Sequence, residues 1–402
     1  MGFLRATPLN SECINTKNRN PSVYISVTEG FFNFGGFSKL NNTLPEYSKK
    51  QSVKPNRLYY LDFLRILSAF AVVMIHCSAV LKHYSFYGNT FSNSFENTEL
   101  FIYNFFNCIS RFAVQIFVMI SGTLFLDNSK NFTIEKILKK YAKRILISYF
   151  IFLVIYYIFS FFIFEIYDID LFIYQVAYHL WFLPMIFSLY ILTPILRKII
   201  NDEKLIKYII IVGIIFFIIL PSVVYLPKIR DFKVIIMSFC NDSKITYVLY
   251  FVLGYYINKK SYSQKFNIVI YILGLSSFLF LPILSMLGMN HGYGPEEFSS
   301  NNFFILNFLE AISVFLFIKN LFNKYTFNEK ILNFISWLSK YTFGIYLVHV
   351  LLIKFVHKYN ILDNVHIHIT ILPLIYCIAI FILSFVISFI ISKIPFINKY
   401  IF

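Results

Sequence analysis

A carboxylic acid, an arginine and a histidine lie inside one apolar stretch, residues 57–80, which begins at Arg57. They are Asp62, Arg65 and His76. On an α-helix, which turns about 100° per residue, all three fall within roughly 60° of one another and can face one interior seam. A carboxylate, a guanidinium and an imidazole are costly in hydrocarbon, and such groups usually mark functional sites in membrane proteins. The stretch therefore predicts a membrane helix with a functional site on one face.

The spacing of these residues also predicts their depth. The step from Arg65 to His76 rises about 16 Å along a helix, which is roughly half the thickness of the hydrocarbon core. Arg65 is therefore expected near one membrane face and His76 near the midplane. Alternatively, Asp62 and Arg65 form an interfacial ion pair while His76 only packs. The shared face favours a functional site, because residues with unrelated roles have no reason to align.

Polar side chains also interrupt later apolar runs. Arg111 and Gln115 lie one helical turn apart, before a Ser121-Gly122 pair that allows close helix approach. An arginine in an apolar run needs an anion, a carboxylate or a water-filled cavity. Glu310 is an intramembrane carboxylate with no partner in its own run. It is expected either to orient an imidazole or to pair with Arg111.

Two further histidines stand in apolar segments. His179 and Trp181 open one run, in which Pro184 is expected to kink the helix and widen a vestibule. His349 lies inside another run, which follows a Ser-to-Gly turn at residues 339–344. Ordinary interfacial aromatic placement explains the first pair equally well, and His349 can be a packing residue.

The composition defines the class of protein. The chain has 402 residues, of which 58% are hydrophobic and 14% charged, and this is more apolar surface than a soluble core could hide. The net charge of +16 does not indicate a nucleic-acid partner, because the basic residues fall in short patches between apolar runs. The five cysteines are scattered singly, without metal-ligand or disulfide spacing. We therefore expect a polytopic membrane protein with no metal and no nucleic acid.

The order of polar and apolar segments predicts the topology. Residues 1–56 are rich in Asn, Ser and Lys and are expected to form a flexible cytoplasmic tail, and residues 57–402 a transmembrane domain. Basic residues concentrate in alternate loops, which by the positive-inside rule places both termini in the cytoplasm, although the basic loop at 227–245 then lies outside. The predicted fold is all-α, a polytopic bundle of about ten transmembrane helices in the cytoplasmic (inner) membrane. The expected spans are 57–80, 100–126, 145–165, 179–196, 208–226, 234–257 (interrupted by polar residues 241–244), 267–288, 302–319, 342–356 and 369–392.

Taken together, these motifs resemble the acyltransferase 3 family of integral membrane O-acyltransferases. The resemblance rests on the segments 61–65, 110–122, 179–183, 250–256 and 343–349, with His76 at a fixed interval after Arg65. The chain is most similar to the stand-alone branch, because no segment after residue 392 could form the extracytoplasmic SGNH hydrolase-like domain of some members. It departs from the pattern at Gln115, where many members have proline, and no second arginine accompanies Arg111.

The resemblance implies a reaction, the transfer of an acetyl group from acetyl-CoA to a hydroxyl of a surface polysaccharide or its lipid-linked precursor. A hydroxyl is a poor nucleophile unless a base takes its proton, and a neutral imidazole suits that task near neutral pH. His76 is expected to be this base or, alternatively, to carry the acetyl group covalently. Asp62, Arg65 and Glu310 complete the expected catalytic set.

The same resemblance implies binding sites for both substrates. The phosphates of CoA require cationic groups, although positive-inside topology alone also explains the basic loop at 136–144. Expected partners are the lipid bilayer, acetyl-CoA, the acceptor glycan and glycan-assembly proteins. The expected CoA-binding residues are Arg65, Arg111, Lys139, Lys140 and Arg144, and the expected acceptor-binding residues are His179, Trp181 and His349.

Two other classes of function fit intramembrane charges. A transporter or flippase for a glycan or lipid-linked sugar would also need them, but the two halves of the chain carry no repeated pair of broken helices. A silent membrane anchor for a glycan-assembly complex would not need Asp62, Arg65 and His76 on one face. We therefore favour the acyltransferase.

Overall fold

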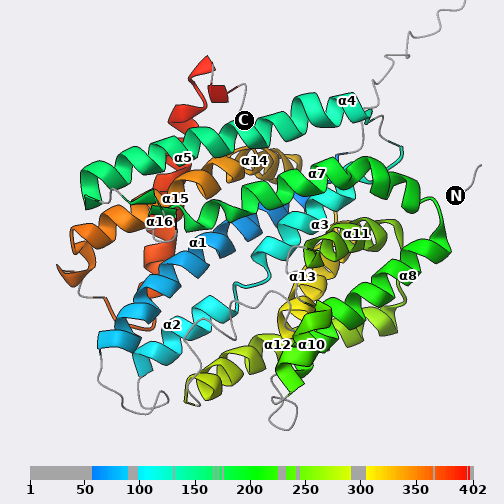
Figure 1. Cartoon of the computed structure of the whole chain (residues 1–402), viewed down its shortest axis with the longest axis horizontal. Coiled ribbons are helices and arrows are strands. Elements are labelled where there is room, and N and C mark those ends of the chain that lie inside the picture. The colour runs from blue at the N-terminus through cyan, green and yellow to red at the C-terminus, as the bar shows by residue number, and fades with distance from the viewer. Residues whose placement is uncertain are drawn as a thin grey trace, which may run out of the picture. The chain divides into compact units, whose positions relative to one another are not determined.

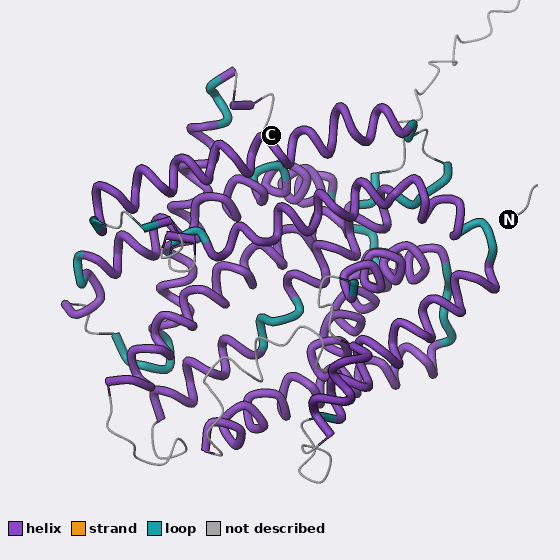
Figure 2. The backbone as a smooth tube through the Cα atoms, in the orientation of Figure 1, coloured by secondary structure: helices purple, strands orange, loops and turns teal. Residues whose placement is uncertain are grey.

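The computed structural model describes residues 57–88, 98–129, 132–165, 168–169, 172–173, 176–224, 232–240, 245–290, 305–364, 367–395 and 397–398. The expected tail at 1–56 lies outside these ranges, as do the polar interruption at 241–244 and much of the loop at 227–245. Within the described residues every regular element is helical (Figure 2). The all-α prediction is therefore confirmed.

The helices in the described ranges vary in length from 3 to 30 residues. In chain order they are α1 (Tyr59–Gly88), α2 (Thr98–Cys108), α3 (Ala113–Phe125), α4 (Ile134–Lys136), the π-helix η1 (Ile137–Ala142), α5 (Lys143–Phe164), the 3-10 helix η2 (Tyr178–Trp181), α7 (Phe182–Ile199), α8 (Glu203–Ile214), the π-helix η3 (Ile215–Ile219), α9 (Leu220–Val223), α10 (Lys233–Cys240), α11 (Thr246–Lys259), α12 (Gln264–Asn290), α13 (Ile305–Lys324), α14 (Glu329–Ser339), α15 (Thr342–Lys358), the 3-10 helix η5 (Ile361–Asn364) and α16 (Leu372–Ile391).

The apolar segments expected from the sequence are found in these helices. Within the described ranges, eight helical stretches are long and apolar enough to cross a membrane, or up to nine if the bent pair α14–α15 counts as one span. The multi-pass prediction is thus confirmed, with a lower count than the expected ten. When eight are counted, the expected ninth span is missing, because the 17-residue α15 passes only together with α14. In both counts the expected sixth span is missing, because it is divided between α10 and the 14-residue α11. Neither half alone reaches the length that a membrane crossing needs.

Polar residues at loop ends explain where several helices begin. The Thr133 side chain accepts a hydrogen bond from the Lys136 backbone N–H at the start of α4. Asp202 and Asn328 cap α8 and α14 in the same way. Each cap satisfies a backbone donor that has no partner within the first turn of a helix.

The helix α1 (blue in Figure 1) has protein on most of its sides. It packs against α2, α3, α13, α14, α15 and α16. Asp62 is 2% exposed, and Ser68 and Ser78 are fully buried. This arrangement keeps the polar side chains of α1 away from lipid, which is what their cost in hydrocarbon requires.

The helices α3 and α11 approach each other through two glycines. A Cβ atom added to Gly254 would lie 2.0 Å from the Met119 carbonyl oxygen, and one added to Gly122 would lie 1.7 Å from the Phe251 carbonyl oxygen. Small residues of this kind allow membrane helices to pack backbone against backbone. In the same contact, the Thr123 hydroxyl donates a hydrogen bond of 2.8 Å to the Gly254 carbonyl.

A buried lysine caps the C-terminal end of α11. The Lys319 side chain of α13 donates hydrogen bonds of 2.6, 3.0 and 2.8 Å to the carbonyls of Ile257, Asn258 and Lys260. These carbonyls lie at the negative end of the helix dipole, where a cation is stabilising. Tyr60 of α1 also donates to the Asn258 side chain at 2.5 Å. The ends of α1, α11 and α13 are therefore joined by polar contacts.

Replacement of Gly254 tests the close contact between α3 and α11. Gly254→Ala is expected to lower the melting temperature of the purified chain in detergent, because overpacking against backbone costs about 1–3 kcal/mol. Gly213→Ala is the matched control, since its nearest neighbour is a Leu249 methyl group at 2.9 Å that can move. Equal melting temperatures for the two variants would contradict the close contact.

Candidate functional site

A cavity of about 390 Å³ lies alongside α1. Its walls come from α1, α3, α7, the η1–α5 helix, η2 and the junction of α14 with α15. Arg65 and His76 both line this cavity, whereas Asp62, the third residue expected on the same helix face, does not. The cavity has a basic part near the start of α1 and a part rich in imidazoles further along the helix.

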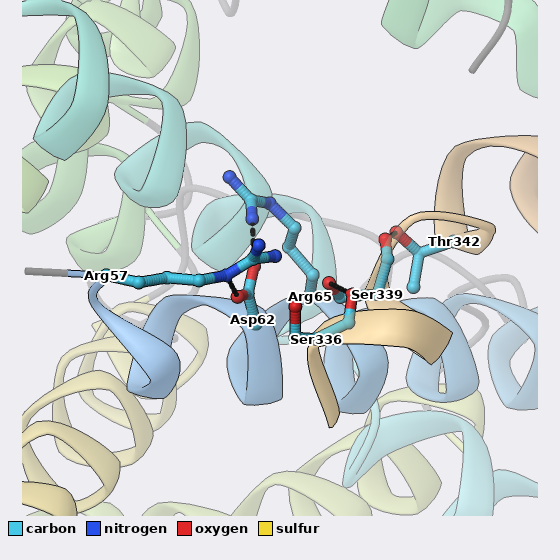
Figure 3. Close-up of polar contacts among 6 residues, drawn as sticks. All are labelled: Arg57, Asp62, Arg65, Ser336, Ser339 and Thr342. Atoms are coloured by element: carbon cyan, nitrogen blue, oxygen red, sulfur yellow. Dashed lines mark hydrogen bonds and ion pairs between the residues drawn. The ribbon is translucent and has the colours of Figure 1, made fainter. Parts of the chain in front are cut away.

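The basic part is organised by one carboxylate. The Asp62 side chain accepts a 2.6 Å bond from Arg57 Nε and a 2.5 Å bond from an Arg65 guanidinium nitrogen. Figure 3 shows both guanidinium groups turned toward Asp62. Because Arg57 and Arg65 line the cavity, Asp62 fixes the orientation of two cations that can receive an anionic ligand. The spacing of Asp62 and Arg65 on one helix turn is what makes their contact possible.

Two more cations complete the basic part. Arg144 and Lys340 also line the cavity, and the Arg144 guanidinium stacks 5.7 Å from the centre of the Phe343 ring. Tyr190 lies among them, with its hydroxyl hydrogen-bonded to Ser121 and within the electrostatic range of Arg65 and Arg144. This end of the cavity therefore offers several charge-assisted donors to phosphate-like groups.

A break in the helical path contributes to the same wall. The helices α14 and α15 meet at a bend of 54°. At the bend, the Thr342 hydroxyl donates to the Ser339 carbonyl at 2.8 Å and the Ser339 hydroxyl donates to the Ser336 carbonyl at 3.0 Å (Figure 3). Ser339, Lys340 and Thr342 all line the cavity. These hydroxyls satisfy carbonyls that the bend leaves without helical partners.

Three histidines from separate segments meet at the other part of the cavity. The ring centre of His76 lies 5.1 Å from that of His349 and 6.3 Å from that of His179, and the last two are 5.5 Å apart. His179 and His349 are almost completely buried, whereas His76 is partly accessible. No group of three or more His, Cys, Asp or Glu side chains among the described residues is placed to hold a metal ion.

Two tyrosines hold this cluster. The Tyr178 hydroxyl lies 3.1 Å from His76 Nδ1. The Tyr346 hydroxyl donates to the His179 carbonyl at 2.6 Å, and the Tyr346 carbonyl lies 2.6 Å from His349 Nδ1. His349 Nδ1 must therefore carry the proton of this bond, and in the neutral ring Nε2 then keeps a lone pair.

The region between the two parts is apolar. Its walls include Val72, Phe117, Ile120 and Phe182. We call this region the apolar corridor. At the imidazole part, Trp181 is 44% exposed, lines the cavity and has its ring centre 5.6 Å from that of Tyr247. The exposed indole gives this part of the site an aromatic surface.

The residues expected in the site that do not line this cavity are six: Asp62, Arg111, Lys139, Lys140, Glu310 and His349. Arg111 is held by the Asn107 side chain, to which its Nε donates at 2.9 Å. Glu310 is fully buried, and its carboxylate has no hydrogen-bond partner among the described residues, although it lies in the electrostatic field of Arg111. Of the two partners expected for Glu310, the structure places it near Arg111.

The two lysines lie on the outer side of the basic segment. Lys139 pairs with Glu135 at 2.6 Å, and both side chains are largely exposed. Lys140 lies 5.6 Å from the centre of the Tyr141 ring, and that ring lines the cavity. Arg144 is therefore the member of this basic segment that reaches the cavity, because the helix turns it inward.

Several residues of the site were not among the sequence-based candidates. Arg57 is the first residue of the expected first span, and Lys340 falls in a turn. Tyr178 and Tyr346 stand beside His179 and three residues before His349, so the histidine motifs themselves could have indicated them. Tyr190 had no such signal, since the chain contains 30 tyrosines.

Comparison with known proteins adds one finding. A family model described as an acyltransferase domain, Acyl_transf_3, matches residues 58–393. No curated protein and no solved structure matches the chain significantly. The matched range includes every residue that lines the cavity except Arg57.

Thiol labelling tests whether the cavity is open to water and basic. Thr342→Cys places a thiol at a position that lines the cavity. Thr193→Cys is the matched control, because Thr193 is also buried but does not line the cavity. In a background without the native cysteines, an anionic methanethiosulfonate should modify Thr342→Cys at least about tenfold faster than a cationic one, since a basic cleft concentrates anions. Equal labelling of the two variants, or faster labelling by the cation, would contradict this description.

Proposed function

Because this chain belongs to the acyltransferase 3 family of membrane acyltransferases, we propose that it moves an acetyl group from acetyl-CoA to a hydroxyl of a surface polysaccharide or its lipid-linked precursor. The observation that supports this reaction best is the single cavity that joins a cluster of cations to a cluster of imidazoles. The phosphates of the acyl donor need cations, and the acceptor alcohol needs a base that takes its proton.

The basic part is the proposed CoA site. CoA carries a pyrophosphate and a further phosphate, which suit Arg57, Arg65, Arg144 and Lys340. Asp62 orients two of these cations, and so acts as a positioning residue. The apolar corridor can then receive the uncharged arm that carries the thioester.

The imidazole part is the proposed site of acetyl transfer. If His76 donates its Nδ1–H to the Tyr178 oxygen, its Nε2 carries the lone pair that accepts a proton. His76 then takes the proton of the acceptor hydroxyl as the hydroxyl oxygen bonds to the thioester carbon. When the carbon–sulfur bond breaks, His76 returns this proton to the departing sulfur, so that CoA leaves as a thiol.

The exposed Trp181 is the proposed contact for the acceptor. An aromatic face gives a sugar ring a large apolar surface to pack against, and Trp181 lies at the imidazole part of the cavity. His179 and His349 stand behind His76, where their neutral rings can hold the hydroxyl or support the His76 ring. The acceptor would therefore approach from the side of the cavity opposite the CoA phosphates.

This assignment sets the proposed orientation in the cytoplasmic membrane. Acetyl-CoA is a cytoplasmic metabolite, so the basic part should face the cytoplasm, together with the start of α1 and both termini. Surface glycans are assembled or displayed on the other side. The proposed partners are accordingly the bilayer, acetyl-CoA, the acceptor glycan and the proteins that assemble it.

Deletion of the gene tests the activity, and His76→Ala tests the base. NMR of the surface glycan should lose its O-acetyl signals on deletion and regain them with the wild-type chain. His76→Ala should lower transfer about 100- to 10,000-fold at equal membrane abundance, since this is the usual contribution of a general base. Unchanged O-acetylation after deletion would refute the proposed reaction, and full restoration by the alanine variant would refute the role of His76.

Arg65→Ala tests the CoA site. Loss of a charge-assisted hydrogen bond costs about 1.5–3 kcal/mol, so the KM for acetyl-CoA should rise about 10- to 150-fold. Lys207→Ala is the control, because Lys207 pairs with Glu203 on an exposed surface and does not line the cavity. A KM that stays the same in both variants would remove Arg65 from the donor site.

A further inference from the structure

A side chain from α2 reaches the backbone of α1 next to His76. The Asn107 amide nitrogen donates a 3.0 Å hydrogen bond to the Ile75 carbonyl and lies 3.2 Å from the Ser78 hydroxyl. That hydroxyl donates in turn to the Met74 carbonyl at 2.6 Å. Asn107 and Ser78 are fully buried. The turn of α1 that carries His76 is thus tied laterally to α2.

The orientation of the Asn107 amide is fixed from the other side. Arg111, one turn later, donates through Nε to the Asn107 side-chain oxygen at 2.9 Å and through a second guanidinium nitrogen to the same oxygen. Because both donors face the oxygen, the amide nitrogen must turn toward α1. Arg111, which does not line the cavity, therefore has a hydrogen-bonded path through Asn107 to α1.

The position of this contact on the helix allows it to control the direction in which the His76 ring points. Ile75 and Ser78 lie within roughly 60° of each other on the α1 surface, and His76 lies about 100° from Ile75 and about 160° from Ser78. The anchor is thus on the α2 side of the helix while His76 points into the cavity. Any rotation of α1 about its axis would stretch the Asn107 bonds and swing the imidazole away from Tyr178.

We propose that Asn107 is a positioning residue for His76, held in register by Arg111. It touches neither substrate, and it acts by fixing the rotation of α1. The inference rests on the proposed function, since it assigns His76 the proton transfer. A displacement of about 1 Å at a reacting group can cost about 100-fold in rate, which sets the scale of the expected effect.

The isosteric change Asn107→Asp tests the proposal. It keeps an oxygen for Arg111 but removes the amide donor to Ile75 and Ser78. Transfer is measured on the purified full-length chain in nanodiscs with radiolabelled acetyl-CoA and surface polysaccharide isolated from a deletion strain. We expect kcat to fall about 10- to 100-fold while the KM for acetyl-CoA stays within about twofold of wild type.

Asn104→Asp is the matched control on the same helix. Asn104 is equally buried, and its amide donates to the Pro282 carbonyl of α12 at 3.2 Å rather than to α1. The two variants should lose similar thermal stability, but Asn104→Asp should keep kcat within about threefold of wild type. A kcat loss that is equal in both variants, or a change confined to KM in Asn107→Asp, would overturn the positioning role.

Ser78→Ala keeps the proposal testable if Asn107→Asp does not fold. This milder change removes the hydroxyl that Asn107 contacts, and kcat should fall several-fold. Ser68→Ala is its control, because Ser68 is equally buried on α1 but its hydroxyl has no hydrogen-bond partner among the described residues. Equal kcat values for both serine variants would overturn the proposal.

The outcomes separate this proposal from the proposed function. If the wild-type chain itself transfers no acetyl group, the proposed function fails, whereas an active wild type with unaffected variants refutes the positioning role alone.

Discussion

The cost of placing polar groups in an apolar medium governs the arrangement of this protein. The helix α1 carries a carboxylate, a guanidinium and an imidazole, so it must be surrounded by other helices. In the most apolar 18-residue window of each candidate span, the buried share is 61% for α1 and 72% for the α2–α3 segment. In the segments that contain α5, α8, α12 and α16, this share is only 28%. The less buried helices expose large apolar side chains, among them Phe162, Ile211, Leu275 and Ile382, and so form the boundary with lipid. The polar helices thus occupy the interior, and the site lies among them.

Those parts of the site that depend on geometry within one helix were predictable from the sequence. The rotation between Arg65 and His76 follows from helix periodicity, so their common access to one cavity could be expected without coordinates. The existence of the apolar helices was predictable for a similar reason, because the length and hydropathy that a crossing needs are local properties. His179 and Trp181 reach the same cavity from a segment whose histidine and aromatic residues were visible in the sequence.

Those parts that depend on lateral neighbours were not predictable. Arg65 and Arg111 look alike in the sequence, since each is an arginine inside an apolar run, yet one lines the cavity and the other is bound to Asn107. The difference is set by which helix lies beside each residue, and this information is not local. The 54° bend between α14 and α15 is a second example, because it brings Lys340 to the basic part of the cavity.

The separation of the two parts of the cavity has an electrostatic reason. His76 can act as a base only if it can become positively charged for a moment, and a neighbouring cation opposes that. At an effective dielectric constant of about 20, a unit charge at ~4 Å would raise the energy of the imidazolium by about 4 kcal/mol, whereas at ~16 Å the penalty is about 1 kcal/mol. The helix rise between Arg65 and His76 is about 16 Å, and the apolar corridor between them adds no charge. Cations that suit phosphates can therefore share one cavity with an imidazole that still accepts a proton, provided that the ligand is long enough to reach both.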